Sequence, residues 1–169
     1  RLLLILFTSL VSFAAHADTV LIENVRIFNG VDEKLTAGNV LVVDGLISTI
    51  SSDEIEAPDG AAVIAGNNRI LTPGFIDLHV HLAMHSPMGS DYEHATAVGA
   101  RSVSAAKFFL DHGFTTISDA GGTQPDLARA FNSGVLYGPR VFPSGAIVSQ
   151  TAGHGDWRAP HEKNPAHTG

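Results

Sequence analysis

The sequence predicts an α/β protein in which a parallel sheet or barrel with its helices follows a small β-unit. Two observations lead to this prediction. Residues 18–71 contain short apolar runs of β-type composition, separated by turn residues. From residue 72 onward the pattern becomes strand, helix, strand, helix and strand, an order typical of parallel βα units. The two patterns meet at Thr72-Pro73-Gly74, so the chain is predicted to combine two structural units.

The first unit is predicted from four apolar runs and the turns between them. Asp44-Gly45 separates the second run from the third and is a strong hairpin signal, because a type I′ turn needs a positive φ at both central residues. Four strands are too few for this unit to close on itself. The predicted strands span residues 20–28, 40–43, 46–50 and 61–64.

In the second unit, strand 75–82 is predicted to have one aliphatic face and one chemically active face. Side chains alternate along a strand, so residues two apart point the same way. The active face would carry Phe75, Asp77, His79 and His81. The aliphatic face would carry Ile76, Leu78, Val80 and Leu82.

Helices and strands are predicted to alternate after this first strand. Gly113 is placed to end the first helix, since glycine readily adopts the left-handed conformation found there. Thr123 is predicted to cap the second helix and Pro125 to lie in its first turn. The predicted elements are a helix at about 91–112, a strand at 114–118, a helix between Thr123 and Gly134, and a strand at 140–144.

Composition excludes several classes of protein. The 169 residues include 10 Lys plus Arg against 17 Asp plus Glu, a net charge of −7 without a basic run. Nucleic acid is therefore not an expected partner, because its phosphates require clustered basic residues. The chain contains no Cys, which excludes disulfide scaffolds and cysteine zinc fingers, and its 44% hydrophobic residues are enough for a globular core.

Residues 1–17 are predicted to be a signal peptide. An apolar run of 12 residues follows Arg1, and Ala15-His16-Ala17 is a small-x-small cleavage pattern. Cleavage after Ala17 would leave Asp18 first and send the protein to the periplasm or the medium. The alternative is a membrane anchor, but the run is well short of the roughly 20 residues that span a bilayer. No stable membrane span is expected after cleavage.

His79 and His81 are the leading candidates for metal ligands. They lie two apart on the predicted strand, so both imidazoles project from one face and can bind one ion. They also stand at the end of a strand that opens an α/β pattern, where parallel barrels place their active sites. The alternative is a pair of ordinary polar residues at a strand end.

Three further residues are candidates for supporting roles. Asp77 could orient a histidine ligand by accepting its second ring proton, or it could be a structural carboxylate bonded to backbone donors. Asp119 ends the second strand and carries the same two interpretations. His154 lies in a glycine-rich loop after the third strand, where it could contact substrate or have only a loop role.

Several segments together resemble the amidohydrolase superfamily. Leu71-Thr-Pro-Gly-Phe-Ile-Asp-Leu-His79-Val-His81 resembles its first-strand signature, and the β-unit before it resembles its accessory β-sandwich. Three later segments are similar to the imidazolonepropionase-like branch, which includes exported Xaa-Pro dipeptidases. These segments are Thr115-Thr-Ile-Ser-Asp-Ala-Gly-Gly, Gly138-Pro-Arg-Val and Thr151-Ala-Gly-His154-Gly-Asp.

The resemblance implies a (β/α)8 TIM-like barrel with one or two divalent metals, usually zinc, that activate water. His79 and His81 match the first-strand ligands. The carboxylated Lys, later His ligands and catalytic Asp of dipeptidase-like members have no counterparts, because the three lysines stand in other segments. Three strands of eight cannot close a barrel, so a truncated barrel is expected. The implied domains are a signal peptide at 1–17, part of the accessory β-sandwich at 18–71 and three βα units at 72–169.

The predicted function is metal-dependent hydrolysis of an amide- or peptide-type carbon–nitrogen bond, with a dipeptide or an acylated amino acid as substrate. The first alternative is a single-metal deaminase or cyclic-imide hydrolase on the same fold. The second is an exported, non-catalytic, His-rich metal-binding protein, since the chain has 9 His, although they are dispersed rather than clustered. A catalytic base is expected beyond residue 169, and a homo-oligomer is left open.

Overall fold

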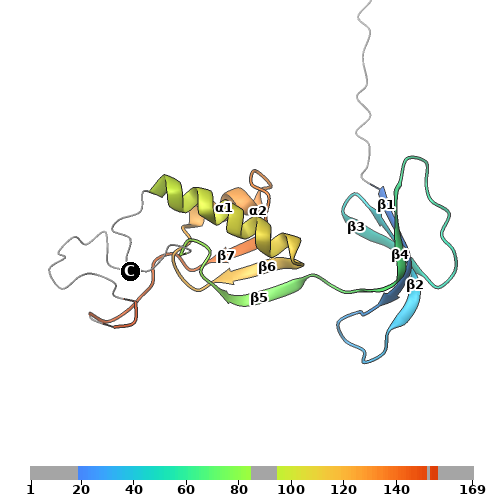
Figure 1. Cartoon of the computed structure of the whole chain (residues 1–169), viewed down its shortest axis with the longest axis horizontal. Coiled ribbons are helices and arrows are strands. Elements are labelled where there is room, and N and C mark those ends of the chain that lie inside the picture. The colour runs from blue at the N-terminus through green and yellow to red at the C-terminus, as the bar shows by residue number, and fades with distance from the viewer. Residues whose placement is uncertain (1–18, 85–94, 152, 156–169) are drawn as a thin grey trace, which may run out of the picture. The chain divides into compact units, whose positions relative to one another are not determined.

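The computed structural model describes residues 19–84, 95–151 and 153–155, and the chain divides into two compact units between Pro73 and Gly74 (Figure 1). The first unit contains strands β1 (Thr19–Ile27), β2 (Thr36–Val43), β3 (Leu46–Ser51) and β4 (Ala62–Leu71). The second contains β5 (Phe75–Val80), α1 (Ala95–Asp111), β6 (Phe114–Asp119), α2 (Pro125–Asn132) and β7 (Arg140–Pro143). No helix in these described ranges is both long and apolar enough to cross a membrane.

The first unit is a four-stranded sheet with the order β3-β2-β1-β4. β1 pairs antiparallel with β2 and parallel with β4, and β2 pairs antiparallel with β3. The predicted type I′ hairpin is confirmed between β2 and β3, because Asp44 and Gly45 both have positive φ, at 52° and 75°. The described residues of this unit form one sheet, so its assignment to a β-sandwich stays a prediction.

The fourth strand is longer than the predicted 61–64, because it continues through a bulge that contains two asparagines. β4 continues to Leu71, and its register with β1 shifts between the pairs Glu23–Ala65 and Val25–Arg69. Asn67 and Asn68 take positive φ values of 52° and 62° at this shift. Asparagine tolerates that conformation better than most residues, so the strand bulges here and then resumes.

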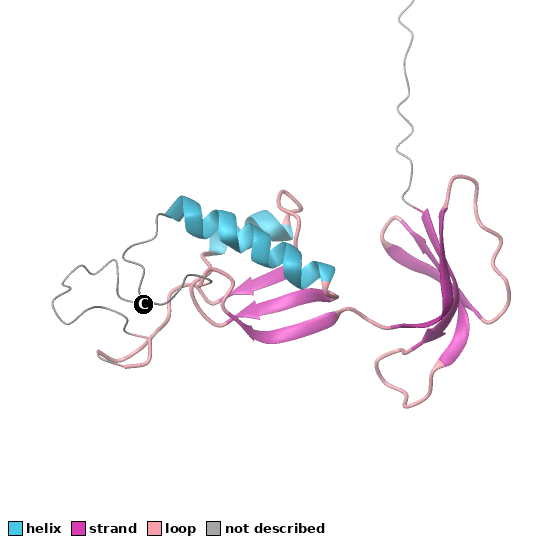
Figure 2. Cartoon of the chain, in the orientation of Figure 1, coloured by secondary structure: helices cyan, strands magenta, loops and turns pink. Residues whose placement is uncertain are grey.

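The second unit is a three-stranded parallel sheet in the order β5-β6-β7, and α1 and α2 cover one of its faces (Figure 2). Side chains from the strands and both helices meet in one core between these layers. The predicted α/β order with parallel pairing is confirmed, whereas the described strands do not test closure into a barrel. The buried core residues are Val80, Leu82, Ala106, Ile117, Ala128, Phe131 and Val141.

The helix boundaries confirm part of the prediction and correct one cap. α1 ends at Asp111, and Gly113 follows with φ 89°, as its predicted role requires. The predicted start of this helix, at about residue 91, lies outside the described residues. The prediction that Thr123 caps α2 is wrong: the cap position is Gln124, and it makes no side-chain cap bond. Thr123 uses its hydroxyl elsewhere, in a bond to Asp119.

The prediction of strict alternation along strand 75–82 is also wrong. Val80 and Leu82 are buried, but Ile76 and Leu78 are 62% and 76% exposed. Asp77 and Val80 are three residues apart on β5, whereas their partners on β6, Ile117 and Asp119, are two residues apart. β5 therefore contains one extra residue at this point. Asp77 pairs with the buried Ile117 and therefore lies on the helix-covered side, away from the face predicted for it.

Candidate functional site

The bulge in β5 contains His79 and is followed by His81. His79 is the second-last residue of the strand and His81 comes directly after it. Their ring centroids lie 5.2 Å apart and their ring planes meet at 81°. Because Val80 and Leu82 are buried in the core, the backbone at this end of the strand is anchored while the two imidazoles lie beside each other. The structure thus brings the predicted ligand pair together.

The ring of His81 is held by the loop after β6. Its Nδ1 lies 3.1 Å from the carbonyl oxygen of Gly121. A carbonyl oxygen can only accept, so this contact assigns the proton to Nδ1, which donates it to Gly121. In the neutral ring, Nε2 then carries a free lone pair. Metal-bound histidines commonly show this arrangement, in which one ring nitrogen donates to a carbonyl and the other binds the metal.

Asp77 fixes the main chain at His79 rather than an imidazole ring. Its Oδ1 accepts a hydrogen bond of 3.0 Å from the backbone N–H of His79. This bond spans the extra residue in β5. It supports the prediction that Asp77 is a structural carboxylate bonded to a backbone donor. Orientation of a ligand ring by this carboxylate stays a prediction, since the bond seen acts on the backbone.

Asp119 is the most heavily bonded side chain near the pair, and it is only 2% exposed. Its Oδ2 accepts hydrogen bonds from the backbone N–H of Leu82, at 2.7 Å, and from the hydroxyl of Thr123, at 2.7 Å. Its Oδ1 accepts from the backbone N–H groups of Gly121, at 3.0 Å, and Thr123, at 3.2 Å. The carboxylate therefore joins the end of β5 to the loop between β6 and α2.

Main-chain hydrogen bonds join the same ends of all three parallel strands. Ala120 N–H donates to the carbonyl of Val80, at 2.8 Å, and Ser144 N–H donates to the carbonyl of Asp119, at 3.2 Å. Gly121 must also lack a side chain, because a Cβ there would collide with Ile147. The carbonyl that holds His81 is consequently part of a tightly packed loop in which the N–H groups of residues 120–123 are hydrogen-bonded.

His154 lies in the glycine-rich segment after β7, which is described at residues 149–151 and 153–155. Two hydrogen bonds hold this segment: Gly153 N–H donates to the carbonyl of Gln150, at 2.8 Å, and Gly155 N–H donates to Ser149 Oγ, at 3.1 Å. The His154 side chain is exposed. In the part of the chain that the structure describes, no group of three His, Cys, Asp or Glu residues is placed to hold a metal. The predicted substrate contact of His154 stays a prediction.

Of the other histidines, His112 lies in the part of the chain that the structure describes. His112 follows α1, where its Nδ1 lies 2.8 Å from the carbonyl oxygen of Phe108 and its ring lies 3.9 Å from the Phe108 ring. The His112 side chain is exposed. His16, His85, His94, His161 and His167 lie outside the described residues.

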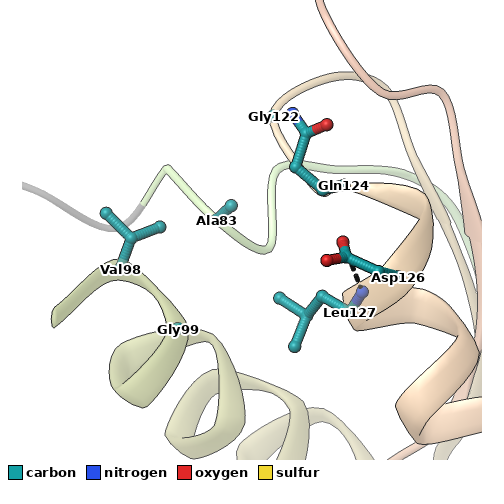
Figure 3. Close-up of a pocket in the computed structure, with 7 residues that line it drawn as sticks. All are labelled: Ala83, Val98, Gly99, Gly122, Gln124, Asp126 and Leu127. Atoms are coloured by element: carbon teal, nitrogen blue, oxygen red, sulfur yellow. Dashed lines mark hydrogen bonds between the residues drawn. The ribbon is translucent and has the colours of Figure 1, made fainter. Parts of the chain in front are cut away.

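A pocket of about 400 Å³ lies between α1, α2 and the turn after β5, and its lining does not include the histidine pair (Figure 3). Asp126 Oδ1, which lines the pocket, accepts a hydrogen bond from the backbone N–H of Leu127, at 2.9 Å. This carboxylate therefore bonds to the main chain in the first turn of α2. The lining residues are Ala83, Val98, Gly99, Gly122, Gln124, Asp126 and Leu127.

Two members of the bonded network were missed by sequence reasoning. Thr123 was interpreted as a helix cap, and Gly121 was noticed only as part of a family segment. The available signal was Asp119-Ala-Gly-Gly-Thr123, in which a strand-ending carboxylate is followed by glycines and by a hydroxyl four residues on. Such a carboxylate can accept from several backbone N–H groups of the turn that follows it.

A parallel βα sheet whose first strand ends in a histidine pair is the arrangement of metal-dependent barrel enzymes. Residues 70–168 match the amidohydrolase family, and the chain belongs to that family. Its members are hydrolases that act on carbon–nitrogen bonds, and the family is generally metal-dependent. The predicted family is therefore confirmed.

Curated proteins that are similar to this chain carry the names of different enzymes. The chain is 38% identical over 92 residues to an ochratoxinase from Aspergillus niger, which covers 52% of this chain and 19% of the relative. It is 35% identical over 150 residues to a dihydroorotase from Anaeromyxobacter dehalogenans, which covers 81% of this chain and 31% of the relative. The chain thus spans about a fifth to a third of the length of these curated relatives.

Solved structures include a prolidase in complex with N-methylphosphonate-L-proline. It is 28% identical to this chain, with a TM-score of 0.73, and the match covers 88% of this chain and 37% of the prolidase chain. The fold described above is therefore shared with a part of that enzyme.

Proposed function

We propose that the protein carrying this chain is a metal-dependent hydrolase that cleaves the amide or peptide bond of a dipeptide or an acylated amino acid. The observation that carries this proposal is the histidine pair, with the Nδ1 proton of His81 directed to the Gly121 carbonyl. His79 and His81 would supply two imidazole nitrogens to one ion, and imidazole is a common ligand of zinc.

The residues present fit such a metal in part. Two neighbouring imidazoles at a strand end match a catalytic site in donor type and position, and His81 already has the proton arrangement that a ligand needs. A catalytic zinc site has three protein ligands, so the proposal requires at least one more from outside the described residues. When bound, the metal would bring the pKa of its water towards about 7 and polarise the substrate carbonyl.

The chain's own residues have three proposed tasks. His79 and His81 bind the metal through their ring nitrogens. Asp77 holds the main chain of His79, and the Gly121 carbonyl orients the ring of His81. His154, on its exposed turn, contacts the substrate.

The dipeptide substrate is supported by the prolidase, whose ligand contains a proline residue. Hydrolysis of a cyclic amide is the second candidate, because the dihydroorotase match spans 81% of this chain. A panel containing Xaa-Pro dipeptides, acylated amino acids and cyclic imides, assayed with the complete protein, separates the two. Turnover of the cyclic compounds alone would move the proposal to the second candidate.

Substitution of each histidine by Ala in the complete protein tests the metal site. His79→Ala and His81→Ala should each lose most of the bound metal and the hydrolytic activity, because the remaining site is under-coordinated. His154→Ala should keep its metal and show a raised KM. His112→Ala is the matched control, since it removes an imidazole that lies outside the site. Full metal occupancy in both ligand variants, measured by elemental analysis, would refute the assignment.

Export is a separate part of the proposal and rests on residues 1–17, which lie outside the described residues. A reporter fused to this segment should be exported and should begin at Asp18 after cleavage. A reporter that stays in the cytoplasm, or one that remains uncleaved in the membrane, would contradict this proposal without affecting the metal site.

A further inference from the structure

We propose that Asp119 and Thr123 are positioning residues that hold His81 in the tautomer with its proton on Nδ1, so that Nε2 is available to the metal. The effect is transmitted through Gly121, whose N–H donates to Asp119 and whose carbonyl oxygen accepts from His81. This inference rests on the proposed function for its consequence, but the tautomer itself can be measured without metal.

The bonding of Asp119 excludes a direct role at the metal or at a ring. An ionised carboxylate has about four acceptor sites, and four donors already occupy those of Asp119. The group is also almost completely buried. Its contribution to the site must therefore pass through the groups that it holds.

Those groups lie on both sides of the contact between His81 and Gly121. On one side, Asp119 Oδ2 binds the N–H of Leu82, the residue directly after His81. On the other side, Asp119 Oδ1 binds the N–H of Gly121, whose carbonyl oxygen accepts from the ring of His81. One carboxylate thus fixes both the residue that carries the ring and the residue that accepts its proton.

Thr123 completes this arrangement from the far side of the loop. Its side chain is fully buried, and its hydroxyl donates to the same Asp119 oxygen that binds Leu82 N–H. Its own N–H donates to the other oxygen. Loss of the hydroxyl leaves a buried carboxylate oxygen with one donor fewer, which favours rotation of the carboxylate and a shift of the Gly121 peptide.

A shift of that peptide changes the metal site in a defined way. A neutral imidazole carries one proton, and the hydrogen bond of one nitrogen determines which nitrogen remains free. With the Gly121 carbonyl in place, Nδ1 keeps the proton. Without it, a larger share of His81 rings carries the proton on Nε2, and that form cannot bind a metal through Nε2.

The test compares Thr123→Val with Thr123→Ser in the complete protein, because Val removes the hydroxyl at nearly constant volume and Ser retains it. Nitrogen NMR of labelled histidine, in metal-free protein, reports the His81 tautomer. Wild type and Thr123→Ser should show the proton on Nδ1, whereas Thr123→Val should show a mixture. His112 is the internal control, since the described contacts of its ring are with Phe108.

Zinc affinity, measured by competition with a chromophoric chelator, gives the second readout. Thr123→Val should weaken binding severalfold and Asp119→Asn about tenfold or more, as is typical when a group supporting a ligand is lost. Thr123→Ser should restore wild-type affinity. If Thr123→Val fails to fold, the His81 signal of Asp119→Asn decides by the same criterion.

An unchanged His81 tautomer in the folded variants would overturn this inference, even if metal binding is normal. Conversely, a wild-type protein that binds no zinc at the histidine pair would refute the proposed function, while the tautomer measurement would still decide the present inference. Equal losses in the Val and Ser variants would also overturn it, because the hydroxyl would then have no special role.

Discussion

A bulge between β1 and β4 in the first unit can be compared with a bulge between β5 and β6 in the second, because different side chains are bonded around them. Between β1 and β4, the register shifts after Glu23 and is resumed at Val25. Between β5 and β6, it shifts after Asp77 and is resumed at Val80. Both are bulges in parallel pairs, where such irregularities are uncommon.

The first bulge is closed by long exposed side chains. Arg69 donates to the carbonyl oxygens of Ala65, at 2.7 Å, and Gly66, at 2.8 Å, while Arg26 donates to that of Asn68, at 3.0 Å. No carboxylate is among these partners. These bonds satisfy main-chain carbonyl groups at the sheet surface. The side chains that make them are arginines, which are not metal ligands.

Two carboxylates hold the chain at the second bulge: Asp77 accepts from the N–H of His79 inside it, and the buried Asp119 accepts from the N–H of Leu82 after it. His79 lies within this bulge and His81 follows it. Flexible arginines can adjust to small shifts of the backbone, but a saturated carboxylate inside a packed core cannot. The comparison indicates that the first bulge affects only the shape of the sheet, whereas the second determines the positions of the His79 and His81 side chains. Variants that strain each bulge separately can test this distinction.

Gly66→Ala should have the largest effect on stability. A Cβ at Gly66 would collide with Val25 and with the backbone oxygens of Glu23 and Asn24, which cannot move independently of the strand. We expect the first unit to lose about 3 kcal/mol of opening free energy, at the upper end for overpacking. Amide hydrogen exchange, resolved by peptide in the complete protein, measures this loss.

The same variant should leave zinc affinity unchanged, because the histidine pair belongs to the other unit. Gly60→Ala is the matched control: its Cβ would meet open space, although its φ of 79° still imposes some strain. Altered zinc binding in Gly66→Ala would contradict the separation of roles between the two bulges.

Gly121→Ala should destabilise the protein less but should affect metal binding. Its Cβ would collide with the side chain of Ile147, which can give way more easily than backbone. We expect a loss of about 2 kcal/mol in the second unit. Displacement of the Gly121 carbonyl should also weaken zinc binding. A destabilised variant that retains wild-type zinc affinity would show that this loop only supports the fold.

Much of the fold could be predicted from the sequence, because its signals are local. Asp44-Gly45 specified a two-residue hairpin through the φ values that it needs, and Gly113 marked the end of a helix in the same way. The alternation of strands and helices then implied parallel pairing. These features depend on neighbouring residues, which the sequence shows directly.

The errors arose where packing in the folded chain, rather than residue type, determined the partner or the direction of a side chain. Thr123 has the residue type and position of a helix cap, but the buried Asp119 competes successfully for its hydroxyl. The alternation expected along strand 75–82 fails because an extra residue is accommodated within the strand, a choice determined by pairing with β6. The histidine pair was still found, since its two-residue spacing survives the bulge that precedes His81.

Asn24→Ala should have a smaller effect than either glycine variant. Asn24 adopts φ 50° in β1, and Ala in this left-handed region is disfavoured by about 1 kcal/mol. Asn24→Gly is the matched control and should be nearly neutral at this step, because glycine adopts positive φ without that steric penalty. Hydrogen exchange of β1 peptides distinguishes the two. Equal losses would indicate that the asparagine side chain, rather than backbone conformation, stabilises the bulge.

Lys107→Met should give the smallest effect and provides the baseline for the comparison, since it lies on α1 outside both bulges. Lys107 forms an exposed ion pair with Asp111, one helical turn away, and its Nζ lies 5.7 Å from the centre of the Tyr137 ring. The hydrogen bond from Lys107 to the carboxylate of Asp111, together with the attraction between the charges, raises the pKa of Lys107 above its ordinary value of 10.5.

A pKa raised in the folded state means that the contribution of Lys107 is fully present at neutral pH. It is lost only as the pH rises from 10.5 through the higher folded-state value. Lys107→Met should therefore shift Tm less than Asn24→Ala at pH 7, because exposed pairs contribute little. Its Tm should also fall less steeply than that of wild type above pH 10, and Asp111→Asn should behave in the same way. A Tm shift at pH 7 larger than that of Asn24→Ala would mean that the pair stabilises α1 through packing, and a different surface variant would then be needed as the baseline.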